Sequence, residues 1–317
     1  MRFLPPKFCR LSICAHALVY VLALSAYGQD KVAIIMPEVR APYKVIFDDI
    51  HDGIVENLNR ESISLIINKE VDSSEIDGWI TNIGIDSIIA LGPAAHKSVS
   101  NISIKLPIAT GAMMTASIND QNSFKVALSP EPSELFNQLK MLNNKISRVA
   151  VVYNPTRYQW LIDLAHNETS SFGIDLAVYE AINIKQSAKI YDQLLADENP
   201  QSLAIWLLQD RTIVDSKVVL PFILERSWQR SIIVFSSSLG HVKKGVLFCM
   251  YPDNKAHGKQ LAEIINNFPK LPPSNYTNPI PTKNSLMAIN SRTAAHLGLD
   301  LKNSDLNKID VVFPLTN

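Results

Sequence analysis

The chain has 317 residues, of which 47% are hydrophobic and 19% are charged, so it can bury a sizeable core in one or two domains. Lysine plus arginine number 30, aspartate plus glutamate also number 30, and neither sign forms a long run. We therefore expect no charged field of the kind that attracts nucleic acid or an anionic membrane surface.

The first residues carry the pattern of a cleavable secretion signal. Basic residues precede an apolar run from residue 11 to 24, and small residues follow at Ala26 and Gly28. The apolar run is shorter than the roughly 20 residues that a membrane-spanning helix needs. We expect residues 1–28 to be a signal peptide that is cleaved after Gly28.

Cysteine usage favours an exported protein without disulfides. Cys9 and Cys14 lie within the expected signal, and neither lies in a lipobox, so a lipid anchor is disfavoured. The mature chain keeps Cys249, which cannot form an internal disulfide and which we interpret as a buried apolar residue. A disulfide-free, slightly acidic, exported chain indicates a bacterial periplasm.

Short β-branched runs alternate with longer helical patterns in the first half of the mature chain. We expect buried strands at residues 31–37, 62–68, 86–91 and 105–114. Apolar residues at helical spacing follow the first of these strands, and Gly92-Pro93 begins a helix after the third. This alternation is typical of βαβ units around a parallel sheet.

The same order begins again at residue 148. We expect strands at residues 148–153, 175–182 and 231–238, and a strand followed by a helix within residues 202–227. The repeat predicts two similar α/β lobes in tandem. Several chain crossings between such lobes would form a hinge, and hinged lobes close on a ligand in the cleft between them.

The corners that follow the strands are the candidate binding positions, because ligands of parallel sheets bind at the carboxyl ends of the strands. Asn154 and Pro155 are explained by starting a helix, and Thr156 with the amides beside it can also receive an anion. Gly92 and its neighbours allow either close ligand approach or tight helix packing. Asp210 and Arg211 suit an ammonium and a carboxylate, or form a solvated surface pair. The candidate ligand-binding residues at these corners are Glu38, Tyr43, Gly92, Pro93, Ala94, Asn154, Thr156, Asp210, Ser236 and Ser237.

No catalytic or metal-binding motif appears in the sequence. The seven histidines have no zinc-ligand spacing, and there is no G-x-S-x-G elbow, Walker A loop or G-x-G-x-x-G turn. We therefore expect a protein that is not an enzyme and that needs no cofactor. An exported hydrolase or isomerase stays an alternative, and it is favoured if groups in the cleft have strongly shifted pKa values beside a nucleophile.

Three segments resemble one family. "RVAVVYNPT", "IIVFSSSLGHVKKGVLFCMYPDNKAHGKQLAEII" and "AINSRTAAHLGLDL" are similar to motifs of the ABC transporter substrate-binding family that contains the tryptophan/tyrosine-type binding proteins. The resemblance covers residues 30–317 and is more specific in the second half.

The resemblance implies a type I periplasmic-binding fold of two Rossmann-like lobes. Residues 29–122 plus 246–280 would form lobe 1, and residues 123–245 plus 281–317 would form lobe 2. When the family's site residues are carried onto matching positions of this chain, the resemblance adds Asp253 to the cleft candidates. The segment "PEVRAPY" departs from the family's His-Pro after the first strand, so the identity of the ligand does not transfer.

The function implied is solute capture in the periplasm by a monomer that delivers its ligand to an ABC permease and its ATPase. The ligand would be a small polar molecule, either an aromatic amino acid or a similar organic anion. The alternative is a sensory protein of the same fold that signals to a membrane kinase or cyclase. Neighbouring genes for a permease or for a kinase would separate these two hypotheses.

Overall fold

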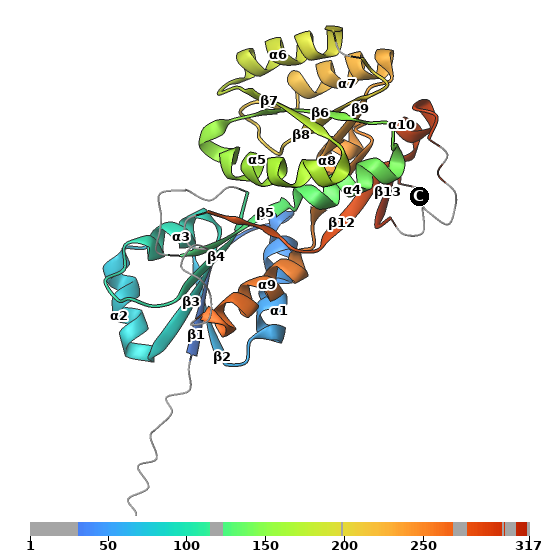
Figure 1. The fold of residues 1–317 in the computed structure, drawn as a ribbon. Coiled ribbons are helices and arrows are strands. Elements are labelled where there is room, and N and C mark those ends of the chain that lie inside the picture. The colour runs from blue at the N-terminus through green and yellow to red at the C-terminus, as the bar shows by residue number, and fades with distance from the viewer. Residues whose placement is uncertain are drawn as a thin grey trace, which may run out of the picture.

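A computed structural model describes residues 31–114, 123–197, 199–268, 278–299, 301 and 309–315. The expected signal peptide, residues 1–28, lies outside the described residues. No helix in the described ranges is long and apolar enough to cross a membrane. Figure 1 shows two α/β lobes joined at a waist near which β5 and β12 lie.

Lobe 1 is built on a six-stranded sheet with the order β11-β5-β4-β3-β1-β2, in which all pairs are parallel. Its core lies on both faces of the sheet, with Ile34 and Ile89 on one face and Ile35 and Ile88 on the other. The elements are β1 (Lys31–Pro37), α1 (Tyr43–Asn57), β2 (Glu61–Ile67), α2 (Ser73–Ile83), β3 (Ile85–Leu91), α3 (Gly92–Ser100), β4 (Ile108–Met113), β5 (Phe124–Pro130), α9 (Asn254–Asn266) and β11 (Ile280–Thr282).

Lobe 2 is built on a seven-stranded sheet with the order β13-β12-β10-β9-β8-β6-β7. All its pairs are parallel except that of β10 with β12. The elements are α4 (Pro132–Leu142), β6 (Arg148–Tyr153), α5 (Pro155–Thr169), the 3-10 helix η1 (Ser170–Phe172), β7 (Asp175–Glu180), α6 (Ile184–Asp197), β8 (Leu203–Leu207), α7 (Val219–Arg230), β9 (Ile233–Ser236), α8 (Leu239–Lys243), β10 (Phe248–Pro252), β12 (Ser285–Asn290), α10 (Ser291–His296) and β13 (Val311–Phe313).

The two sheets repeat one strand order, which confirms the predicted pair of similar α/β lobes. The series β5-β4-β3-β1-β2 in lobe 1 corresponds to β10-β9-β8-β6-β7 in lobe 2. Alternating strands and helices produce this order because each helix returns the chain to the start of the next parallel strand. Each lobe buries apolar side chains on both faces of its sheet, and a fully buried Ile or Leu contributes about 1.5–3 kcal/mol.

Within the described residues the chain crosses between the lobes three times. The crossings lie at Glu131 between β5 and α4, at Asp253 between β10 and α9, and at residues 283–284 between β11 and β12. The second and third crossings are joined, because the Asp253 N–H donates to the Asn284 carbonyl oxygen at 3.3 Å. Three crossings that lie together form the expected multi-crossing hinge.

The expected lobe boundaries differ from this arrangement at three strands. β5 was expected in lobe 2, but it pairs in parallel with β4 and belongs to the sheet of lobe 1. β10 was expected in lobe 1, but it pairs with β9 and β12 in lobe 2. The boundary expected after residue 280 also divides β11, which pairs with β5 as one strand. In each case the pairing of the strand keeps the chain in its lobe for more residues than expected before it crosses to the other lobe.

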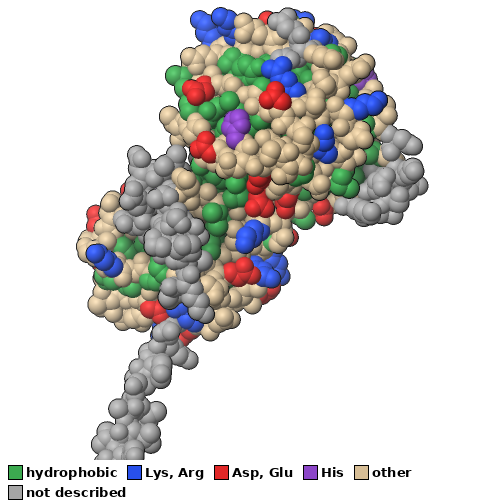
Figure 2. Space-filling view, viewed as in Figure 1, with side chains coloured by type: hydrophobic (Ala, Val, Ile, Leu, Met, Phe, Trp, Pro, Cys, Tyr) green, Lys and Arg blue, Asp and Glu red, His purple; other side chains and the backbone are tan. Residues whose placement is uncertain are grey.

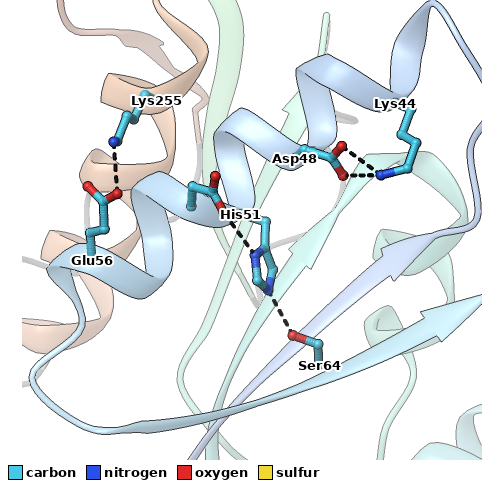
Figure 3. A network of polar contacts seen from close by, with 7 residues as sticks. Lys44, Asp48, His51, Glu56, Ser64 and Lys255 are labelled. Carbon is cyan, nitrogen blue, oxygen red and sulfur yellow. Dashed lines mark hydrogen bonds and ion pairs between the residues drawn. The ribbon is translucent and has the colours of Figure 1, made fainter.

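Helix α9 packs on α1 and so belongs to lobe 1 (Figure 1). Figure 3 shows the polar contacts along α1, where Lys255 Nζ at the start of α9 lies 2.8 Å from Glu56 Oε1. On the same helix His51 Nε2 lies 2.9 Å from Ser64 Oγ on β2. The Lys255–Glu56 pair is exposed and contributes little, so the position of α9 depends on the close approach of the two helix backbones at Gly53 and Gly258.

His257 on α9 connects that helix to the sheet from inside the core. Its Nε2 accepts a hydrogen bond from the Ala112 N–H at 3.0 Å, and its Nδ1 lies 2.8 Å from Thr282 Oγ1. The Thr282 hydroxyl donates to the Ala127 carbonyl oxygen at 2.8 Å, so the His257 ring donates from Nδ1. Burial lowers the pKa of His257 to about 3, and the ring is therefore neutral.

Candidate functional site

The carboxyl-terminal edges of the two sheets face each other across the hinge. The chain leaves lobe 1 for lobe 2 at the end of β5, and it leaves lobe 2 for lobe 1 at the end of β10. β5 is parallel to its neighbours in lobe 1, and β10 is parallel to β9 in lobe 2. The corners after the parallel strands of both lobes therefore lie on the sides that the lobes turn toward each other, where α/β proteins bind ligands.

The corner between β6 and α5 is an N-capped helix start. Asn154 Oδ1 accepts hydrogen bonds from the Thr156 N–H at 3.2 Å and from the Thr156 hydroxyl at 2.8 Å. Pro155 is the first helical residue, where its missing N–H removes no helix bond. Asn154 is buried and Thr156 is exposed, so Asn154 builds the corner and Thr156 is the side chain open to solvent.

Asp210, in the corner after β8, lies in contact with this helix start. Its Oδ1 lies 3.3 Å from Arg157 Nη1, and its side chain is completely buried. The same oxygen accepts hydrogen bonds from the Thr212 N–H at 2.9 Å and the Thr212 hydroxyl at 2.7 Å. The structure thus brings Asp210 and Thr156 into one region, together with Arg157, which the sequence analysis did not single out.

The tyrosines of this corner are fixed inside the lobe. The Tyr158 hydroxyl donates to the Gln209 carbonyl oxygen at 2.8 Å, and burial raises the Tyr158 pKa, with a further rise from Asp210. The Tyr153 hydroxyl donates to Gln159 Oε1 at 2.8 Å, and burial also raises its pKa. Both rings are almost wholly buried, so they support the corner and do not offer a stacking surface.

Ser236 and Ser237 are buried and hydrogen-bonded within lobe 2. The Ser236 hydroxyl donates to the Leu207 carbonyl oxygen at 3.0 Å and lies 2.8 Å from His241 Nδ1. Ser237 Oγ accepts from Trp206 Nε1 at 3.2 Å. These hydroxyls hold the ends of β8 and β9 together and lie beneath the surface of the edge.

Ser236 and His241 are in contact, but they do not act as a nucleophile and its general base. Burial, with a smaller contribution from Lys244, lowers the pKa of His241 to about 4, so the ring is neutral near pH 7. Because Ser236 gives its proton to a main-chain carbonyl, His241 must donate to Ser236 and cannot remove a proton from it. The geometry gives no support to a hydrolase at this position.

The lobe 1 candidates lie at two corners of the facing edge, between β1 and α1 and between β3 and α3. Glu38 and Tyr43 are exposed, and Glu38 lines a hollow of about 430 Å³ at the end of β2 with Ile66 and Trp79. Gly92 begins α3 with a φ of +82°, a conformation that favours glycine, and its Cα faces Phe47. Pro93 is exposed and Ala94 is half-buried in the first turn of α3, which has no side-chain cap.

Asp253 caps a helix at the hinge. Its Oδ1 accepts from the Lys255 N–H at 3.0 Å and from the Ala256 N–H at 3.1 Å. Together with the bond from its N–H to Asn284, these contacts give Asp253 a structural role at the second crossing. Helix capping is a different role from the ligand contact that the resemblance implies.

Carboxylates gather at the first crossing. Glu131 precedes α4, and burial raises the pKa of Glu134 and of Glu168, with the negative charge of Glu131 raising both further. Figure 2 shows acidic side chains near the waist on one face, whereas Lys and Arg are dispersed over both lobes. No group of His, Cys, Asp or Glu in the described part of the chain has the arrangement of a metal site.

Two α/β lobes with mostly parallel sheets, facing edges and three hinge crossings define the type I periplasmic-binding-protein fold, which confirms the expected fold class. A conserved domain protein from Vibrio cholerae O1 biovar El Tor has a TM-score of 0.51 and 16% identity, with 90% of this chain and 99% of that chain covered. An ABC domain in complex with L-Trp from Streptococcus pneumoniae has a TM-score of 0.56 and 16% identity, with 90% and 100% covered.

A third solved structure is the ligand-free, open form of CD0873, a substrate-binding protein with adhesive properties from Clostridium difficile. Its TM-score is 0.61 at 14% identity, with 89% of this chain and 99% of that chain covered. No family model matches the sequence, and no curated protein matches it. At these identities the likeness shows the fold.

Proposed function

We propose that this protein is the periplasmic solute-binding component of an ABC-type uptake system. It captures a small polar ligand, an aromatic amino acid or a similar organic anion, between its two lobes. The observation that carries the proposal is the pair of facing carboxyl-terminal edges joined by three crossings, an arrangement that closes around a ligand by hinge motion.

The corner at the start of α5 supports a polar ligand. Exposed Thr156 and partly exposed Arg157 lie there beside a helix N-terminus, which favours negative charge. The structural likeness to a substrate-binding protein and to an ABC domain holding L-Trp agrees with a receptor of this class. The proposed partners are an ABC permease and its ATPase, and the proposed state is a monomer in the periplasm.

A thermal-shift screen tests the proposal. A ligand that binds the native protein stabilises it by mass action, by about 2.7 kcal/mol at 100 times its Kd. We expect at least one compound from a broad panel of amino acids, organic acids and amines to raise the Tm in a concentration-dependent way. A panel that leaves the Tm unchanged would remove the support for a solute receptor.

A further inference from the structure

Arg157 and Asp210 form an ion pair at the carboxyl-terminal edge of lobe 2. Arg157 is the third residue of α5, which begins where β6 ends, and Asp210 follows the end of β8. β6 and β8 are adjacent and parallel, so these two corners are neighbours. The pair therefore joins two corners of the edge that faces lobe 1.

The carboxylate of this pair is enclosed by the protein. The Asp210 side chain has 0% exposure. Its Oδ1 pairs with Arg157 and accepts hydrogen bonds from the N–H and the hydroxyl of Thr212. Oδ2 is also buried and has no hydrogen-bond partner among the described residues. A buried carboxylate is stable beside a cation, so Arg157 is its counter-ion. A ligand ammonium has no open path to either oxygen in this conformation.

The guanidinium of the pair is open to solvent. The Arg157 side chain is 37% exposed. A guanidinium carries five N–H donors, and among the described residues its one partner is Asp210. Asp210 therefore orients the guanidinium while leaving several of its N–H donors free. A guanidinium held in this way can bind a carboxylate through two parallel hydrogen bonds.

Building on the proposed function, we propose that the ligand presents a carboxylate or similar acidic group to Arg157. Asp210 is a positioning residue that orients the guanidinium, and it does not receive a ligand ammonium. Thr156 precedes Arg157 in the same first turn, and its exposed side chain donates its hydroxyl proton to Asn154 Oδ1. The receptor therefore takes organic acids and does not require an amine on them.

Matched probes separate this inference from the proposed function. One set is 3-phenylpropionate, L-phenylalanine and 2-phenylethylamine, and the other is pentanoate, L-norvaline and butylamine. Within each set the acid is the amino acid without its amine, and the amine is the amino acid without its carboxylate. Thermal shift identifies the compounds that bind, and calorimetry gives the Kd of each.

A charge-neutral double variant, R157Q/D210N, removes the pair without leaving a buried charge alone. The control is R226Q/D192N, which removes an exposed pair of lobe 2 whose charged atoms lie 3.8 Å apart. We expect at least one acid to bind, with a Kd about 10- to 100-fold weaker in R157Q/D210N and unchanged in the control.

Two results would overturn the inference while leaving the proposed function standing. One is binding of amine-bearing compounds alone, and the other is an acid that binds R157Q/D210N as tightly as the wild type. In both cases a ligand is bound, so the receptor function survives. If no compound of either set or of the broad screen binds, the proposed function fails, and the inference fails with it.

Discussion

Gly258 on α9 lies directly against Ile50 on α1, so that a Cβ at position 258 would come within 2.0 Å of the Ile50 carbonyl oxygen. The contact is reciprocal, because a Cβ at Gly53 would come within 2.1 Å of the Lys255 carbonyl oxygen. The two helices approach backbone to backbone where each carries a glycine. Since α9 follows directly on the crossing at Asp253, this packing fixes one end of that crossing to lobe 1.

Replacing Gly258 by Ala is therefore expected to destabilise lobe 1. The new methyl group would meet main-chain atoms that cannot rotate away, so the helices must separate. We expect the free energy of unfolding to fall by about 2–3 kcal/mol, measured by urea denaturation. Gly78→Ala on α2 is the control, since nothing lies within 4 Å of a Cβ there, and we expect a gain of about 0.5–1 kcal/mol. Equal effects of the two substitutions would rule out the tight contact.

The sequence predicted the architecture well because each lobe repeats the same alternation of β-branched runs and helical patterns. It missed the places where the chain crosses, since "FKVALSP" at β5 lies in a linking segment and only pairing with β4 assigns it to lobe 1. The strand-end serines show a second limit. A hydroxyl at a strand end points into the lobe or out of it, and Ser236 and Ser237 point inward to main-chain and indole partners.

Arg157 was missed for a different reason. In the sequence it is one charged residue in the first turn of a helix, a place where arginine is commonly solvated. Its partner Asp210 is far away along the chain, and the parallel pairing of β6 with β8 brings the two corners together. A function that depends on such a pair is visible only in the folded protein.

His257 gives the protein a defined acid sensitivity. Its pKa in the native state is lowered by burial to about 3, whereas the unfolded chain titrates near 6.5. Between these values the unfolded state binds the proton and the native state does not, so stability falls as the pH falls from about 6.5 toward 3.

His257→Gln replaces the histidine with a side chain that does not titrate, so the unfolded state no longer takes up a proton at this position. We expect the loss of stability between pH 7 and pH 4 to be smaller than in the wild type by about 2–3 kcal/mol, although the variant is less stable at pH 7 because the bond to Thr282 is weakened. Urea denaturation at a series of pH values measures both effects. Parallel pH profiles for the two proteins would show that His257 is not held neutral.

Thr156 is predicted to contact the ligand. Thr156→Val removes the exposed hydroxyl that donates to Asn154 Oδ1 at 2.8 Å, in the residue before Arg157. We expect stability to fall by at most about 1 kcal/mol and the Kd for a stabilising compound to rise about 5- to 10-fold. Thr156→Ser, which keeps the hydroxyl, is the matched variant and should bind nearly as the wild type does. If calorimetry gave the same Kd for Thr156→Val as for the wild type, the corner would have only an architectural role.

The central claim is that the two lobes close on a ligand by motion at the three crossings. Small-angle X-ray scattering of the protein, with and without a saturating concentration of a compound that raises its Tm, tests this most directly. Hinge closure brings the facing edges together, so we expect the radius of gyration to decrease on binding. A radius that stays the same at saturation would contradict closure.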